Sequence, residues 1–67
     1  MRTLGDDYPK QQARCRALLQ TYKSLPDGSG VLGSVFIEAT LREADEAAIY
    51  GDLPRMMAAY LRMKEHV

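Results

Sequence analysis

The chain has 67 residues, with nine basic and nine acidic side chains and a formal net charge of zero. A chain of this length predicts one small domain, residues 1–67, which buries only about 60% of its unfolded surface and therefore needs a further source of stability. The single cysteine excludes an intrachain disulfide, and together with the single histidine it offers too few ligands for a structural zinc site. A contact with a second copy or with another protein is the source of stability that remains.

The balanced charge points neither toward nucleic acid nor away from it. No apolar run approaches the ~20 residues that a membrane span requires, and residues 1–7 lack the apolar segment of a signal peptide. A lone cysteine is typical of a reducing compartment. We therefore expect a cytoplasmic protein without membrane contact.

The first predicted helix runs from Tyr8 to about Leu25, after a flexible lead at residues 1–7. Its apolar residues recur at steps of three, four and seven, which places them on one helix face. Pro26 disfavours a helical conformation at the preceding residue and ends the helix. Cys15 lies on the apolar face, so we expect a buried, unreactive thiol. A nucleophilic role would need a histidine base, and His66 is the only histidine.

Residues 26–33 are the predicted interhelix linker, because three glycines, a proline and an Asp-Gly pair favour turns. Gly28, Gly30 and Gly33 also match the G-x-G-x-x-G pattern of dinucleotide sites. That pattern requires a preceding strand within a βαβ unit, and here a helix precedes it. We interpret the segment as a linker; a weak anion contact at the start of the next helix is the alternative.

The second predicted helix begins after Ser34, its expected N-cap, and runs to about Tyr50. Ile37, Leu41 and several alanines form its apolar stripe, and small alanines allow close approach of another helix. Four acidic residues lie opposite this stripe: Glu38, Glu43, Asp45 and Glu46. Paired carboxylates can perform acid–base catalysis in a cleft. A solvated helix face is the interpretation that we favour.

The third predicted helix, Leu53 to about Lys64, follows almost at once. Gly51 is the residue type that ends a helix in the left-handed conformation, and Asp52 is a good N-cap. So short a turn predicts an antiparallel αα-hairpin. The apolar face of this helix is wider than one neighbouring helix needs. We expect part of that face to bind a partner or a second copy, through Met56, Met57, Tyr60, Leu61 and Met63.

The predicted fold is therefore all-α, with three helices, the last two forming an antiparallel αα-hairpin with a tight Gly-Asp turn and the first packed across them. The first helix carries basic residues and no acidic ones: Lys10, Arg14, Arg16 and Lys23. An intramolecular match with the acidic second helix, or an acidic protein partner, explains these charges better than nucleic acid does, because the chain has no tryptophan and no recognised DNA-binding motif.

A longer pattern covers most of the chain: Tyr8-Pro9, Gln11-Gln12-Ala13-Arg14-Cys15-Arg16, Leu18-Leu19, Ile37-Glu38, Leu41-Arg42, Ala44-Asp45, Ala47, Gly51-Asp52, Met57, Tyr60 and Met63-Lys64. In this pattern the chain resembles a group of small helical proteins of unassigned function encoded by phages and prophages of proteobacteria. The resemblance implies a phage-gene context, and hence the host cell cytoplasm, but it carries over no catalytic or binding residue.

We expect a non-enzymatic interaction protein, needing no cofactor and no metal, that binds and modulates a host or phage protein and forms a homodimer. Small phage proteins of this size often act by docking on another protein, which is an argument by analogy. The alternative is a nucleic-acid-binding accessory protein that uses the basic face of the first helix. An enzyme is disfavoured because the sequence offers no histidine–acid constellation.

Overall fold

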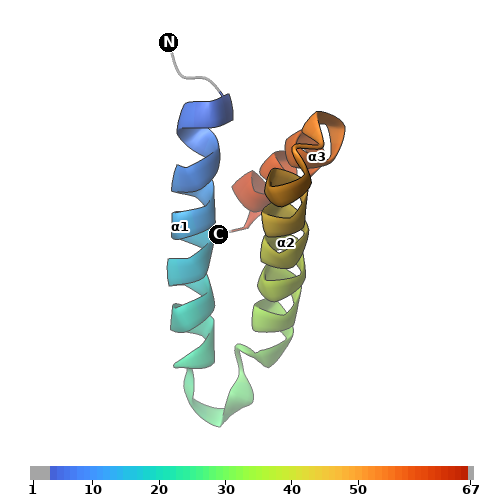
Figure 1. The fold of residues 1–67 in the computed structure, drawn as a ribbon. Coiled ribbons are helices and arrows are strands. Elements are labelled where there is room, and N and C mark those ends of the chain that lie inside the picture. The colour runs from blue at the N-terminus through green and yellow to red at the C-terminus, as the bar shows by residue number, and fades with distance from the viewer. Residues whose placement is uncertain (1–3, 67) are drawn as a thin grey trace.

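A computed structural model describes residues 4–66, apart from the side chain of Asp27. These residues form three α-helices and no strand, so the all-α, three-helix prediction is confirmed. The helices are α1 (Leu4–Lys23), α2 (Val31–Tyr50) and α3 (Leu53–Glu65), and a short 3-10 helix, η1 (Pro26–Gly28), follows α1. Each α-helix contacts the other two. α1 and α2 run alongside each other, while the shorter α3 packs against their upper part (Figure 1).

α1 begins earlier than predicted. Residues 4–7, which we assigned to a flexible lead, form its first turn, and residues 1–3 lie outside the described part of the chain. Asp6 and Asp7 place negative charge at the helix N-terminus, where the helix dipole favours it. Leu4 is half-buried and packs against the core. The hydrophobic contact of Leu4 and the acidic first turn together extend the helix from Tyr8 back to Leu4.

The connection between α1 and α2 is shorter than the predicted linker, because α2 begins at Val31 and not after Ser34. Gly30 is the N-cap residue. It lies so close to the end of α1 that a Cβ at this position would be 2.1 Å from the backbone oxygen of Tyr22. Ser34 is inside the helix, where its hydroxyl donates to the Val31 carbonyl at 2.8 Å. The close approach of two backbones therefore sets where α2 begins.

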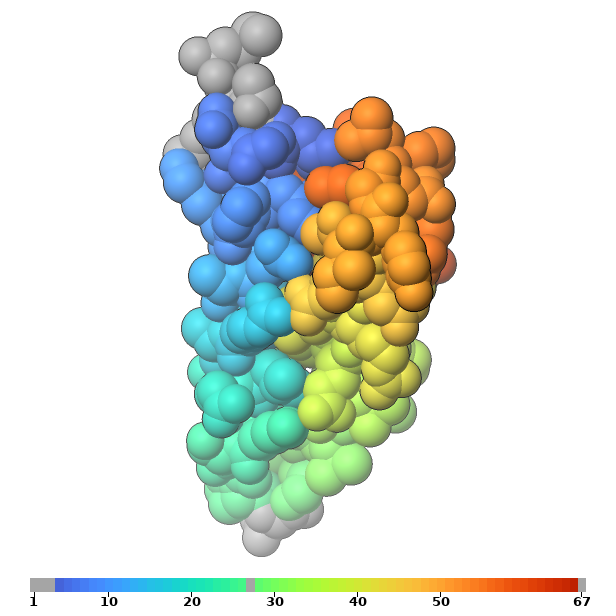
Figure 2. Space-filling view, in the orientation of Figure 1, coloured from blue at the N-terminus to red at the C-terminus, as the bar shows by residue number. Residues whose placement is uncertain are grey.

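The core lies where the three helices meet and takes residues from each of them: Tyr8, Cys15 and Leu19 from α1, Ile37, Leu41 and Ala44 from α2, and Ala59 and Met63 from α3. Cys15 is fully buried, as predicted. Alanines on α2 and α3 allow these helices to approach closely. In the space-filling view, the lower part of the face consists of the end of α1 and the start of α2 (Figure 2). Within residues 4–66, no helix is both long and apolar enough to span a bilayer.

Candidate interaction surfaces

Two of the four basic residues that we singled out on α1 form ion pairs with α2. Arg16 Nη2 lies 2.6 Å from Asp45 Oδ2, and Lys23 Nζ lies 3.1 Å from Glu38 Oε1. Gln12 adds a hydrogen bond to the other oxygen of Asp45 at 2.8 Å. The structure therefore shows the intramolecular charge match that the sequence favoured. These side chains are about half exposed to solvent, so each pair contributes on the order of 0.5 kcal/mol.

Arg14, the third basic residue, points toward the end of α3. Its guanidinium donates to the backbone carbonyl of His66 at 2.7 Å and to that of Met63, while Nε donates to Gln11 Oε1 at 2.9 Å. The last carbonyls of a helix have no intrahelical partner, and a cation is favourable there. Arg14 is therefore a C-cap supplied by a neighbouring helix. No local sequence signal indicates this role, because it depends on contacts that span 49 and 52 positions of the sequence.

His66 also ties the C-terminal end of α3 to α2, because its Nε2 lies 2.9 Å from the hydroxyl oxygen of Thr40. The Cys15 thiol also points here, with Sγ 3.5 Å from the Met63 carbonyl. Burial raises the pKa of this thiol, which outweighs the lowering by Arg14 and Arg16. A thiol with a raised pKa is a poor nucleophile at neutral pH. The structure thus assigns Cys15 and His66 to packing and capping.

Lys10 is the one member of the basic set for which the described part of the chain holds no ion-pair or hydrogen-bond partner. The other three are engaged within the molecule. A nucleic-acid backbone would have to compete with Asp45, Glu38 and the end of α3 for their charges. The basic face of α1 is therefore not a continuous stripe of available cations.

The residues that we expected to bind a partner separate into two groups. Met63 is fully buried, and Met56 and Tyr60 are half-buried against the core, so these three stabilise the monomer. Met57 and Leu61 are exposed, at 47% and 54%. For Met63 the structure corrects our assignment to a contact surface, because it packs beneath α3 between α1 and α2. The binding of a partner by Met57 and Leu61 stays a prediction.

Polar contacts decide which row of α3 faces inward. The Tyr60 hydroxyl donates to Asp7 on α1, and the rings of Tyr60 and Tyr8 are stacked with their centroids 6.5 Å apart. The Tyr8 hydroxyl in turn donates to the Ala44 carbonyl of α2 at 2.7 Å. Tyr60 therefore holds its row against α1. Leu53, Met57 and Leu61, spaced four residues apart, form the row that faces outward.

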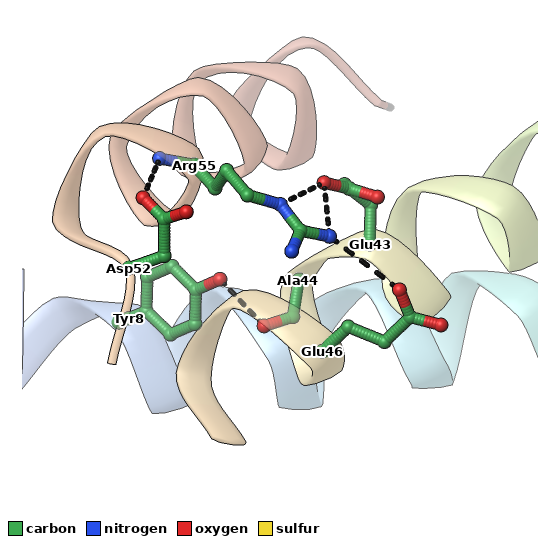
Figure 3. A network of polar contacts seen from close by, with 6 residues as sticks. All are labelled: Tyr8, Glu43, Ala44, Glu46, Asp52 and Arg55. Atoms are coloured by element: carbon green, nitrogen blue, oxygen red, sulfur yellow. Dashed lines mark hydrogen bonds and ion pairs between the residues drawn. The ribbon is translucent and has the colours of Figure 1, made fainter. Parts of the chain in front are cut away.

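Arg55 connects α3 to the acidic residues of α2 (Figure 3). Its Nε lies 2.8 Å from Glu43 Oε1, and its Nη2 lies 2.8 Å from the same oxygen and 3.4 Å from Glu46 Oε2. The hydrogen bond with Glu43 raises the pKa of Arg55 above its ordinary value. All four acidic residues of α2 thus have a basic neighbour, as expected for a solvated helix face.

Large apolar side chains are exposed at both ends of α2. One group lies at the end of α2 and along α3 and is called the junction surface: Ile49, Tyr50, Leu53, Met57 and Leu61. The other lies at the start of α2 and the end of α1: Leu25, Val31, Leu32, Val35 and Phe36. Single exposed apolar residues are ordinary, whereas groups of them are the usual candidates for interaction surfaces.

Two shallow depressions, each with a volume of about 330 Å³, lie beside these groups, one lined in part by Ile49 and the other by Phe36. The first lies between α1 and α2, with Leu19, Leu41 and Ile49 among its lining residues. The second lies between α2 and the end of α3 and is lined by Phe36, Ala39, Thr40, Arg62, Glu65 and His66. Within the described residues, no three His, Cys, Asp or Glu side chains are close enough to hold a metal ion.

Comparison of the chain with known protein families, with curated proteins and with solved structures found no match. Its function is therefore inferred from the surfaces and contacts described above.

Proposed function

We propose that this chain is a small, non-enzymatic interaction protein that binds another protein through the junction surface. The observation that carries the proposal is the outward row of α3, in which Leu53, Met57 and Leu61 are all exposed at a spacing of four residues. Ile49 and Tyr50 extend the row onto the end of α2. A helix with such a row fits an apolar groove on a partner, as in the common helix-in-groove mode of recognition.

In this proposal α2 and α3 form an antiparallel αα-hairpin that presents the row rigidly. Support comes from the two residues between the helices. Gly51 has a φ of 64°, in the left-handed region, and the Asp52 N–H donates to the Ala47 carbonyl at 3.0 Å. Asp52 then accepts from the Arg55 N–H at 3.2 Å, which caps α3. Arg55 ties the helices together through Glu43.

The proposal includes a biological setting and an assembly. On the resemblance to phage and prophage proteins, the chain acts in the cytoplasm of a host cell, where it modulates a host or phage protein by binding it. A homodimer is proposed because a chain of 67 residues builds a small core and exposes two apolar surfaces.

The test is an affinity capture from host extract with matched variants. Met57→Lys places a charge in the middle of the junction surface, whereas Val35→Lys places one at a residue of similar exposure, 52%, at the other end of α2. We expect mass spectrometry to find a protein that wild type and Val35→Lys retain and Met57→Lys loses, and the purified pair should bind directly. Equal capture by both variants would contradict the use of the junction surface.

The nucleic-acid alternative has less support, since three of its four proposed residues are engaged within the molecule. A salt-sensitive gel shift that Lys10→Glu weakens would restore it.

A further inference from the structure

Phe36 is exposed beside the depression between α2 and the end of α3. Its side chain is 58% exposed, and Leu32, one helical turn earlier, is exposed as well. The small residue Ala39 lines the same depression and is also exposed, so another backbone could approach closely there. A large aromatic side chain next to a shallow hollow is typical of a contact between proteins.

Arg62 and Glu65 line the α3 side of this depression with opposite charges. Other exposed basic residues, such as Arg16 and Lys23, have acidic neighbours within 4 Å. Among residues 4–66, by contrast, neither Arg62 nor Glu65 has an ion-pair or hydrogen-bond partner. The two residues are three positions apart on α3 and therefore project from one side of the helix.

We propose that Phe36, Ala39, Arg62 and Glu65, together called the Phe36 edge, are the contact between two copies of this chain around a two-fold axis. In such an interface each contact occurs twice, so a pairing of Arg62 with Glu65 of the partner subunit brings its reciprocal. A surface with one unpaired cation and one unpaired anion complements itself. A partner of a single charge sign would leave one of the two residues unpaired.

On α2 the Phe36 edge and the junction surface lie toward opposite ends, whereas on α3 they meet, because Leu61 directly precedes Arg62. A dimer formed at the edge leaves Leu53 and Met57 available to a different protein. This inference deepens the proposed homodimer and rests on it, while partner capture through the junction surface is independent of it. The two proposals can therefore fail separately.

Sedimentation equilibrium of the full chain over a broad concentration range tests the pairing. Arg62→Glu opposes two carboxylates across the axis, and Glu65→Arg opposes two guanidinium groups. We expect each single variant to dimerise at least about tenfold more weakly than wild type, because two attractions become two repulsions. The double variant should dimerise like wild type, and so should an equimolar mixture of the two single variants. Phe36→Ser should weaken all of these dimers.

Lys10→Glu is the matched control, since Lys10 is an exposed cation on α1 that does not line the depression. It should leave the dimer unchanged, and circular dichroism should show that all of these surface variants remain helical. A wild type that is monomeric throughout would overturn the proposal. Single variants as dimeric as wild type, or a double variant as weak as the single ones, would overturn it equally.

Discussion

Tyr8, on α1, contacts both of the other helices. It is 3% exposed, its hydroxyl donates to the Ala44 carbonyl, and its ring stacks on Tyr60. Burial raises the pKa of this phenol, and the charges of Asp45 and Glu43 raise it further. Because the folded state holds the proton more tightly than the unfolded state, the stabilisation is complete below the unfolded pKa of about 10 and is lost as the pH rises through the higher folded pKa.

We therefore expect the wild type to lose stability between neutral pH and about pH 11, because the Tyr8 phenol of the unfolded chain ionises at a lower pH than that of the folded chain. Tyr8→Phe should lower the free energy of unfolding by about 1 kcal/mol at neutral pH, because a hydrogen bond is lost. Its free energy of unfolding should then fall less than that of the wild type when the pH is raised. Urea unfolding of both proteins at the two pH values measures the difference. An identical alkaline loss in both proteins would show that other groups cause it.

Arg14 makes a stability contribution that its charge alone does not explain. It donates to two carbonyls at the end of α3, which a point charge on a flexible stem cannot reproduce equally well. Arg14→Ala should destabilise the fold by about 2 kcal/mol, because two hydrogen bonds from a charged group are lost and the His66 carbonyl loses its partner. Arg14→Lys should recover only part of this loss. Lys10→Ala is the control in urea unfolding and should change little.

At the scale of elements, two glycines limit α2 for different physical reasons. Gly51 has a positive φ of 64°, and a Cβ there would meet nothing within 4 Å, so only the backbone conformation disfavours other residues. Gly30 has an ordinary φ of −95°, but a Cβ there would collide with the backbone of Tyr22.

Gly51→Ala should therefore cost about 1 kcal/mol, the penalty of a left-handed residue with a side chain. Gly30→Ala should cost more, at least about 2 kcal/mol, because the end of α1 and the start of α2 must separate. Thermal unfolding of the two variants shows which substitution lowers the stability more. A larger loss for Gly51→Ala would mean that the connection between α1 and α2 adjusts readily.

The same two glycines show how far the sequence could predict the elements. The role of Gly51 follows from local residue preference, and so does the cap formed by Asp52. The role of Gly30 depends on contact with Tyr22 across the connection, which no local pattern contains, so Ser34 looked like the better cap. Periodicity likewise predicted the wide apolar face of α3. The contacts of Tyr60 with Asp7 and Tyr8 decide which row is buried.

In the whole molecule, the short helix α3 packs against the two longer helices α1 and α2. α3 has 13 residues, whereas α1 and α2 have 20 each, so α3 covers only part of the surface that the long helices form together. Phe36 lies where this cover ends, beside the last turn of α3. The sequence indicated excess apolar surface but placed it on α3 alone. The exposed residues at the start of α2 follow from the unequal helix lengths, which only the folded arrangement shows.

A second copy on this uncovered surface would make stability depend on protein concentration. Once the protein is mostly dimeric, mass action raises the apparent free energy of unfolding by about 1.4 kcal/mol per dimer for each tenfold rise in protein concentration. In a domain of this size that corresponds to a rise of a few degrees in melting temperature. We expect calorimetry of the wild type to show this rise, and Phe36→Ser to reduce it, since the exposed ring contributes little to the monomer core. A melting temperature independent of concentration would show that three helices with Arg14, Arg55 and Tyr8 between them suffice to hold the chain folded alone.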